Sequence, residues 1–102
     1  MEVFEAIAQP KRREILRLLA DGERSAGEVA ARFDVTQPAI SQHLRVLKDA
    51  GLVEERREGT RRMYRVRPEG LDDLHEFLAE VLPLGLRRLK RAAEEEARRG
   101  RA

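Results

Sequence analysis

The sequence predicts a mainly α-helical fold that carries one two-stranded β-hairpin. Apolar residues recur at helical spacing in five separate segments. Near residues 58–61, a glycine joins two short stretches that alternate as strands do. The chain has 102 residues and 41% hydrophobic residues but only 4% aromatic ones. We therefore expect a single domain over residues 1–102, with a core of aliphatic side chains.

The first two predicted helices are separated by a proline. Val3, Phe4 and Ile7 lie at helical spacing and predict a short helix over residues 3–8. Pro10 disfavours helix at the residue before it, and it is well suited to begin the second helix, which runs to about Ala20. Four basic side chains of this helix are expected in solvent: Lys11, Arg12, Arg13 and Arg17.

The next two predicted helices are joined by a tight turn. Ser25 followed by Glu28 forms a capping-box pattern that begins a short helix. After a turn at residues 34–35, Thr36 is a suitable N-cap for a longer helix, and Gly51 ends it. The apolar stripe of this longer helix is Ile40, Leu44 and Leu47. Two helices in this order form a helix-turn-helix.

A hairpin and a last helix complete the chain. Strands are predicted over residues 52–57 and 62–66, and a loop over residues 68–70. A strong apolar stripe predicts the last helix over residues 71–98. Pro83 and Gly85 predict a kink or break in it, and the charged tail over residues 92–102 is expected to fray.

Composition excludes several classes of site. The chain has no cysteine, which removes disulfides, thiolate metal sites and thiol redox chemistry. No apolar run reaches the roughly 20 residues that a membrane span needs, and no secretory signal is visible, so we expect a cytoplasmic protein without a membrane partner.

The net charge is only +2, but residues 56–67 hold six arginines and one glutamate. This segment predicts a local basic patch.

The helix over residues 36–50 carries side chains suited to reading DNA. Glutamine can pair with adenine through two hydrogen bonds, and arginine can reach guanine or a phosphate. The first residues of such a helix meet the base edges, and arginines on a following hairpin can meet phosphates or a narrow minor groove. The order of capped helix, polar face and basic hairpin predicts sequence-specific binding to double-stranded DNA. The alternative is an ordinary surface helix with solvated arginines.

Three blocks of the sequence resemble ArsR-type winged helix-turn-helix repressors. They read AQPKRREILRLL over residues 8–19, TQPAISQHLRVLKDAGLV over residues 36–53, and RREGTRRMYRV over residues 56–66. The resemblance covers about residues 3–82. It implies about five helices with a two-stranded β-wing, and a homodimer formed through the first and last helices. It also implies a repressor that occupies an operator until an inducer binds. The two-fold axis of such a dimer predicts an inverted-repeat operator.

The candidate residues follow from these two lines of reasoning. In the helix, the candidate DNA-binding residues are Thr36, Gln37, Pro38, Ser41, Gln42, His43 and Arg45. In the hairpin they are Arg57, Gly59, Thr60, Arg61 and Arg62. The candidate dimer interface is Val3, Phe4, Ile7, Leu74, Phe77, Leu78, Val81 and Leu82. His43 is expected beside the DNA-reading side chains, contacting a phosphate or a neighbouring residue, with a proton switch or a metal ligand as the alternative.

A metal-responsive repressor is one alternative. Some members of the resembled family bind metal through Cys-x-Cys, which would fall near Ser25 and Gly27, where this chain has no cysteine. Others use Asp-x-His on the last helix, which Asp73 and His75 match, but the remaining ligands would fall near Leu86 and Leu89. Two ligands are too few for zinc, so we expect neither a metal nor another cofactor.

A protein-interaction module is the other alternative, although the basic hairpin argues against it. An enzyme is not expected, because His43 and His75 lie on separate elements without a nucleophile beside them. The residues do not indicate the inducer, the operator, the regulated genes or the choice between repression and activation.

Overall fold

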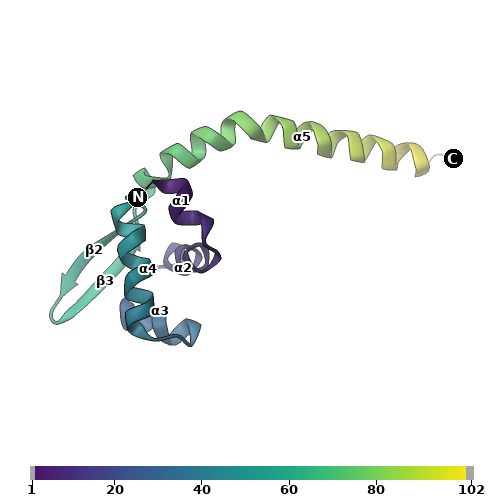
Figure 1. Cartoon of the computed structure of the whole chain (residues 1–102). Helices are drawn as coiled ribbons and strands as arrows, with labels where there is room; N and C mark the ends of the chain where they lie inside the picture. Colours follow the sequence, from purple (N-terminus) through teal and green to yellow (C-terminus); the bar gives the residue numbers. More distant parts are fainter. Residues whose placement is uncertain (1, 101–102) are drawn as a thin grey trace. The chain divides into compact units, whose positions relative to one another are not determined.

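The chain divides after Asp72 into two compact units. The computed structural model describes residues 2–100. The first unit contains helices α1 to α4, the strands and a short 3₁₀ helix, and helix α5 makes up the second (Figure 1). The assignment of residues 1–102 to one domain stays a prediction.

Helices α1 (Val3–Ala8) and α2 (Pro10–Ala20) begin and end where the sequence predicts. Arg13 of α2 is exposed as expected and Arg12 is half-buried, and both guanidinium groups donate hydrogen bonds to the C-terminal end of α1. The accepting carbonyls are those of Glu5, Ala6, Ile7 and Ala8. The last carbonyls of a helix lack partners within it, and a following cation can satisfy them. These two arginines therefore join α1 to α2.

The helix-turn-helix is confirmed as α3 (Ala26–Phe33) followed by α4 (Gln37–Asp49). The capping box of α3 is present: the backbone N–H of Glu28 donates to Ser25 Oγ, and that of Ser25 donates to Glu28 Oε1, each at 3.1 Å. Asp34 makes the turn in the left-handed conformation, with φ of 53°. Thr36 caps α4 by accepting a hydrogen bond from the backbone of Ala39.

The core of the first unit is aliphatic, as the composition predicts. Ile40, Leu44 and Leu47 of α4 are fully buried. The other large buried side chains include Ile15, Leu19, Val29, Leu52 and Val53. Burying each such side chain stabilises the fold by about 1.5–3 kcal/mol. The apolar stripe therefore fixes which side of α4 faces outward.

An antiparallel sheet with the strand order β1-β3-β2 completes the first unit. It consists of β1 (Arg24–Ser25), β2 (Val53–Glu58) and β3 (Arg61–Val66). We call residues 53–66 the wing; β2 and β3 project from the helices as a hairpin (Figure 1). Glu58 pairs with Arg61, so the turn is Gly59-Thr60 alone, two residues shorter than predicted. Gly59 has φ of 63°, a conformation that favours glycine.

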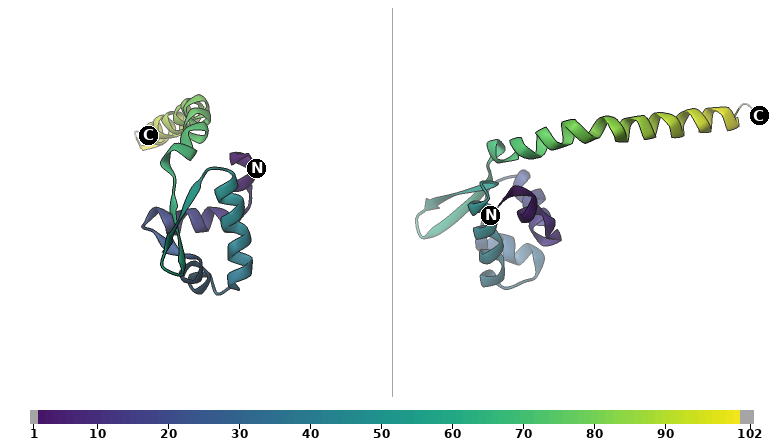
Figure 2. Two further views of the ribbon diagram at one scale, coloured as in Figure 1. Left: turned by 90° about the vertical axis from the view of Figure 1, so that its left-hand side faces the viewer. Right: turned by 45° about the horizontal axis from the view of Figure 1, so that its top comes forward.

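A 3₁₀ helix (Pro68–Leu71), where the sequence predicted a loop, precedes α5 (Asp72–Gly100). Helix α5 continues through Pro83, and it bends gently instead of breaking (Figure 2). The predicted fraying of the tail is wrong up to Gly100, and residues 101–102 lie outside the described residues. The tail is rich in strong helix formers, with glutamates four residues before arginines, and these local preferences favour helix.

His43 lies on a half-buried side of α4, close enough to α2 to be affected by its charges. Burial lowers the pKa of the His43 imidazole, and the positive charges of Arg12 and Lys11 lower it further. The folded protein therefore favours neutral His43.

Replacing Gly70 with alanine should destabilise the first unit. A Cβ on Gly70 would lie 1.9 Å from the carbonyl oxygen of Gly51, where the end of α4 meets the 3₁₀ helix. We expect Gly70→Ala to lower the free energy of unfolding by about 1–3 kcal/mol in urea denaturation. Gly85→Ala is the control, because no atom beyond its chain neighbours and the adjoining helix backbone lies within 4 Å of its Cβ position and alanine favours helix. A loss of equal size in both variants would contradict this packing.

The depressed pKa of His43 predicts a pH-dependent contribution to stability. The unfolded-state pKa is about 6.5, so neutral His43 contributes fully above that pH. The contribution is lost as the pH falls from there through the lower folded-state pKa. We expect His43→Gln to reduce the loss of unfolding free energy between about pH 7.5 and pH 5.5. Parallel pH profiles of variant and wild type in urea denaturation would count against this assignment.

Candidate nucleic-acid interface

One side of α4 carries a set of exposed polar side chains. Because Ile40, Leu44 and Leu47 face the core, the helical repeat turns other positions outward. We call five of these exposed residues the reading face: Gln37, Pro38, Ser41, Gln42 and Arg45. Thr36 is exposed too, and its hydroxyl oxygen caps the helix.

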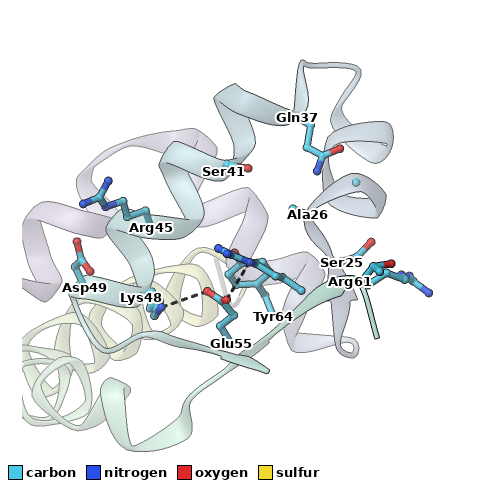
Figure 3. Close-up of a pocket in the computed structure, with 13 residues that line it drawn as sticks. Ser25, Ala26, Gln37, Ser41, Arg45, Lys48, Asp49, Glu55, Arg61 and Tyr64 are labelled. Atoms are coloured by element: carbon cyan, nitrogen blue, oxygen red, sulfur yellow. Dashed lines mark hydrogen bonds and ion pairs between the residues drawn. The ribbon is translucent and has the colours of Figure 1, made fainter. Parts of the chain in front are cut away.

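An open groove runs between α4, the start of α3 and the wing (Figure 3). From the reading face it is lined by Gln37, Ser41 and Arg45. From the wing it is lined by Thr60, Arg61 and Arg62. Six residues predicted from two separate segments of the sequence are therefore brought to one surface.

The other candidates lie outside this groove. Pro38 and Gln42 are exposed on α4, and Arg57 and Gly59 are exposed on the wing, but none of them lines the groove. His43 is half-buried and lies near Lys11 and Arg12 of α2, which fits the predicted contact with a neighbouring residue, and a phosphate contact stays a prediction. Each residue turns an α-helix by about 100°, so His43 points away from Ser41, which stands two positions before it.

Most arginines of the predicted basic patch are paired with carboxylates. Arg61 pairs with Glu28, and Arg62 lies 3.6 Å from Glu55. The other pairs on the wing side are Arg56 with Glu23 and Glu58, Arg65 with Glu54, and Arg67 with Glu69. The patch is therefore less positive than its arginine content indicates. Such exposed pairs contribute about 0–1 kcal/mol each, so a phosphate can displace them.

Two of the four candidate DNA-binding arginines differ from Arg61 and Arg62. Within the part of the chain that the structure describes, neither Arg45 nor Arg57 forms an ion pair. Arg57 lies directly opposite Arg62 in the β2–β3 register. Like charges at opposite positions destabilise a sheet. The repulsion between Arg57 and Arg62 therefore favours the binding of an anion near the end of the wing.

The carboxylates near the groove were not predicted as part of the site. Hydrogen bonds from the backbone and side chain of Ser25 lower the pKa of Glu28, and the charge of Arg61 adds to the effect. A hydrogen bond from Arg56 lowers the pKa of Glu23. Both carboxylates therefore stay ionised at neutral pH. Only Glu28 had a sequence signal, its place in the capping box.

Tyr64 lies beside Glu55 in the groove (Figure 3). Burial raises the pKa of the Tyr64 phenol, and the negative charge of Glu55 raises it further. The phenol therefore stays protonated at neutral pH.

The candidate dimer residues divide into buried and exposed ones. Val3 is only 8% exposed, so the structure corrects its assignment: it is a core residue with little surface left for a partner. Ile7 and Leu74 are half-buried. Five candidates are more exposed: Phe4, Phe77, Leu78, Val81 and Leu82. Further along α5, Leu84, Leu86 and Leu89 are exposed too.

No cluster of three or more potential metal ligands occurs within residues 2–100. Asp73 and His75, the two residues of the metal-sensor alternative, are exposed on α5. None of the helices over the same residues combines the length and apolar content needed to cross a membrane.

Comparison with known proteins places this geometry in a family. Residues 9–55 match the family described as "Bacterial regulatory protein, arsR family". The chain is 45% identical over 83 residues to the HTH-type transcriptional regulator Rv2034 of Mycobacterium tuberculosis, covering 78% of each protein. It is 41% identical over 83 residues to the transcriptional repressor SdpR of Bacillus subtilis, covering 81% of this chain and 92% of that protein.

A solved structure agrees with the fold. The homodimeric winged helix-turn-helix DNA-binding domain from Mycobacterium bovis, determined by NMR, superimposes with a TM-score of 0.63 at 38% identity. The match covers 81% of this chain and 74% of that one. Together with the capped helix pair and the wing, these similarities show that the chain belongs to the ArsR family of winged helix-turn-helix bacterial regulatory proteins.

Proposed function

We propose that this protein is a transcriptional repressor that binds double-stranded DNA sequence-specifically as a homodimer. The observation that carries the proposal is the groove in which the reading face of α4 and the wing arginines meet. The similarity to a repressor and to a homodimeric DNA-binding domain supports it. Since the relatives are named as regulators, we propose no enzymatic activity. A DNA-bound regulator acts where the chromosome lies, which in a bacterium is the cytoplasm.

The dimensions of α4 suit the major groove of DNA. A helix with its side chains is about 10–12 Å wide, and the major groove is about 12 Å wide. In this arrangement Gln37, Ser41 and Gln42 face base edges, and Arg45 faces a guanine or a phosphate. Thr36 and Pro38 set the start of the helix, whose N-terminal dipole favours a nearby phosphate.

The wing provides contacts that do not depend on sequence. Arg61 and Arg62 extend from β3 beside the groove, and Arg57 stands opposite Arg62. Gly59 and Thr60 form the tight turn, which allows a close approach to the sugar-phosphate backbone. Phosphate contacts of this kind set orientation and supply a salt-dependent affinity.

We propose that the dimer forms through α5, with Phe4 and Ile7 of α1 contributing. Leu74, Phe77, Leu78, Val81 and Leu82 form an apolar side of α5 on which most residues are exposed. An exposed apolar stripe of this size marks an interaction surface. A two-fold dimer would place two copies of α4 in successive major grooves, so the operator would be an inverted repeat with half-sites about one or two helical turns apart.

Substitutions in the reading face and the wing should affect DNA binding differently. We expect Gln37→Ala and Gln42→Ala to weaken binding to a duplex selected by the protein from a random pool, by about 1–3 kcal/mol, but not to a shuffled duplex. Arg61→Ala and Arg62→Ala should weaken both and reduce the salt slope by about one. Fluorescence anisotropy at two salt concentrations measures these effects. Equal losses on both duplexes for the glutamine variants would exclude base reading, and no duplex binding at any salt would favour a protein-interaction module.

A charge within the apolar side of α5 should dissociate the dimer. We expect Leu78→Glu to raise the dimer dissociation constant by at least about 100-fold, because it removes an apolar contact and buries a carboxylate. Ala79→Glu is the matched control: it adds the same charge at the next position, which faces away from the stripe. Sedimentation equilibrium measures both. A dimer that tolerates Leu78→Glu as well as the control must use another surface.

A further inference from the structure

Glu55 is a carboxylate placed among the cations of the DNA-binding groove. Its Oε2 lies 3.2 Å from Lys48 Nζ on α4, and its Oε1 lies 3.6 Å from Arg62 Nε on β3. The Glu55 side chain is 20% exposed, whereas those of Lys48 and Arg62 are 51% and 60% exposed. The carboxylate therefore lies deeper than the two cations that it holds, between α4 and the wing (Figure 3).

We propose that Glu55 is an internal counter-ion for Lys48 and Arg62, with which DNA phosphates must compete. Through this competition it weakens the sequence-independent part of DNA binding and lowers its salt dependence. The inference rests on the proposed function, namely that this groove binds DNA.

The charges that line the groove support a competition of this kind. The lining includes the cations Arg45, Lys48, Arg61 and Arg62 and the carboxylates Asp49 and Glu55. Four positive charges are thus offset by two negative ones. Sequence-independent affinity for DNA depends on how many phosphates the protein neutralises. Removing one carboxylate therefore changes a large share of the available charge.

The geometry at Arg62 favours an exchange of ion-pair partner, from Glu55 to a phosphate. The 3.6 Å separation from Glu55 is longer than a normal charge-assisted hydrogen bond of about 2.7–2.9 Å. On the opposite strand Arg62 faces Arg57, another cation. A phosphate near both arginines would relieve their repulsion and offer shorter contacts than Glu55 does. Glu55 therefore holds Arg62 loosely in the free protein and can release it.

The chain offers a matched control at the adjacent position. Glu54 points to the other face of β2, where it pairs with Arg65 of β3. Neither Glu54 nor Arg65 lines the groove. Glu54→Gln therefore removes the same charge from the same strand without freeing a groove cation. Glu28 is unsuitable for the comparison, because it also completes the capping box of α3.

The test measures the binding of the full chain to two duplexes as a function of salt. The probes are a duplex selected by the wild type from a random pool and a shuffled duplex of the same composition. We expect Glu55→Gln to tighten binding to the shuffled duplex by about three- to tenfold near 0.1 M salt. The slope of log affinity against log salt should become steeper by about one. Glu54→Gln should leave the slope unchanged and alter the affinity less than about twofold.

A double variant tests whether the effect passes through Arg62. When Glu55→Gln is added to an Arg62→Gln variant and compared with Arg62→Gln alone, most of the gain in affinity and slope should be absent. Weaker binding by Glu55→Gln, or a change that matches Glu54→Gln, would overturn the inference while the proposed function stands. If the wild type does not distinguish the two duplexes, the proposed sequence specificity fails. The response of Glu55→Gln on the shuffled duplex then still decides the role of Glu55.

Discussion

The burial of one stripe of α4 is the constraint on which the rest of the interface depends. Ile40, Leu44 and Leu47 are fully enclosed by α2, α3 and β2, so α4 cannot rotate without exposing all three. The helical repeat then leaves the reading face outward without any further interaction. The cap at Thr36 and the left-handed Gly51 set the two ends of the helix. Recognition is thus positioned by the core, and the exposed side chains are free to match DNA.

The positive charge of the wing is offset by carboxylates that lie close to it in the folded protein. A net charge of +2 is small for a protein that binds a polyanion, and all the wing arginines except Arg57 have nearby carboxylate partners. Two of these partners, Glu23 and Glu28, are each 33 residues from the arginine that they hold. These pairs link the wing to the segment that begins α3. The same carboxylates therefore fix the wing in place and reduce its attraction for phosphate.

Helix bounds that depend on local residue preferences could be predicted from the sequence. Features that depend on strand pairing and on packing between elements could not. Caps such as Ser25 and Thr36 and the break at Pro10 gave the bounds of the first helices, because each acts within one turn of helix. Strand β1 has two residues, too few to show alternation. Glu55 was missed, because its position beside Arg62 depends on the pairing of β2 with β3. The partial burial of His43 was not predicted either, because it depends on how α4 packs beside α2.

Helix α5 connects the stability of the protein to its proposed mode of binding. It has 29 residues, and none of those described is buried, although an apolar stripe runs along it. Most of the stability of a helix in water comes from packing such a stripe, not from its intrinsic propensity. In the proposed dimer, the contact that covers the stripe also brings two reading faces together. When one subunit binds its half-site, the effective concentration of the second reading face at the other half-site rises. In that dimer, a single apolar surface would provide both the stability that α5 lacks alone and the second contact that an inverted repeat requires.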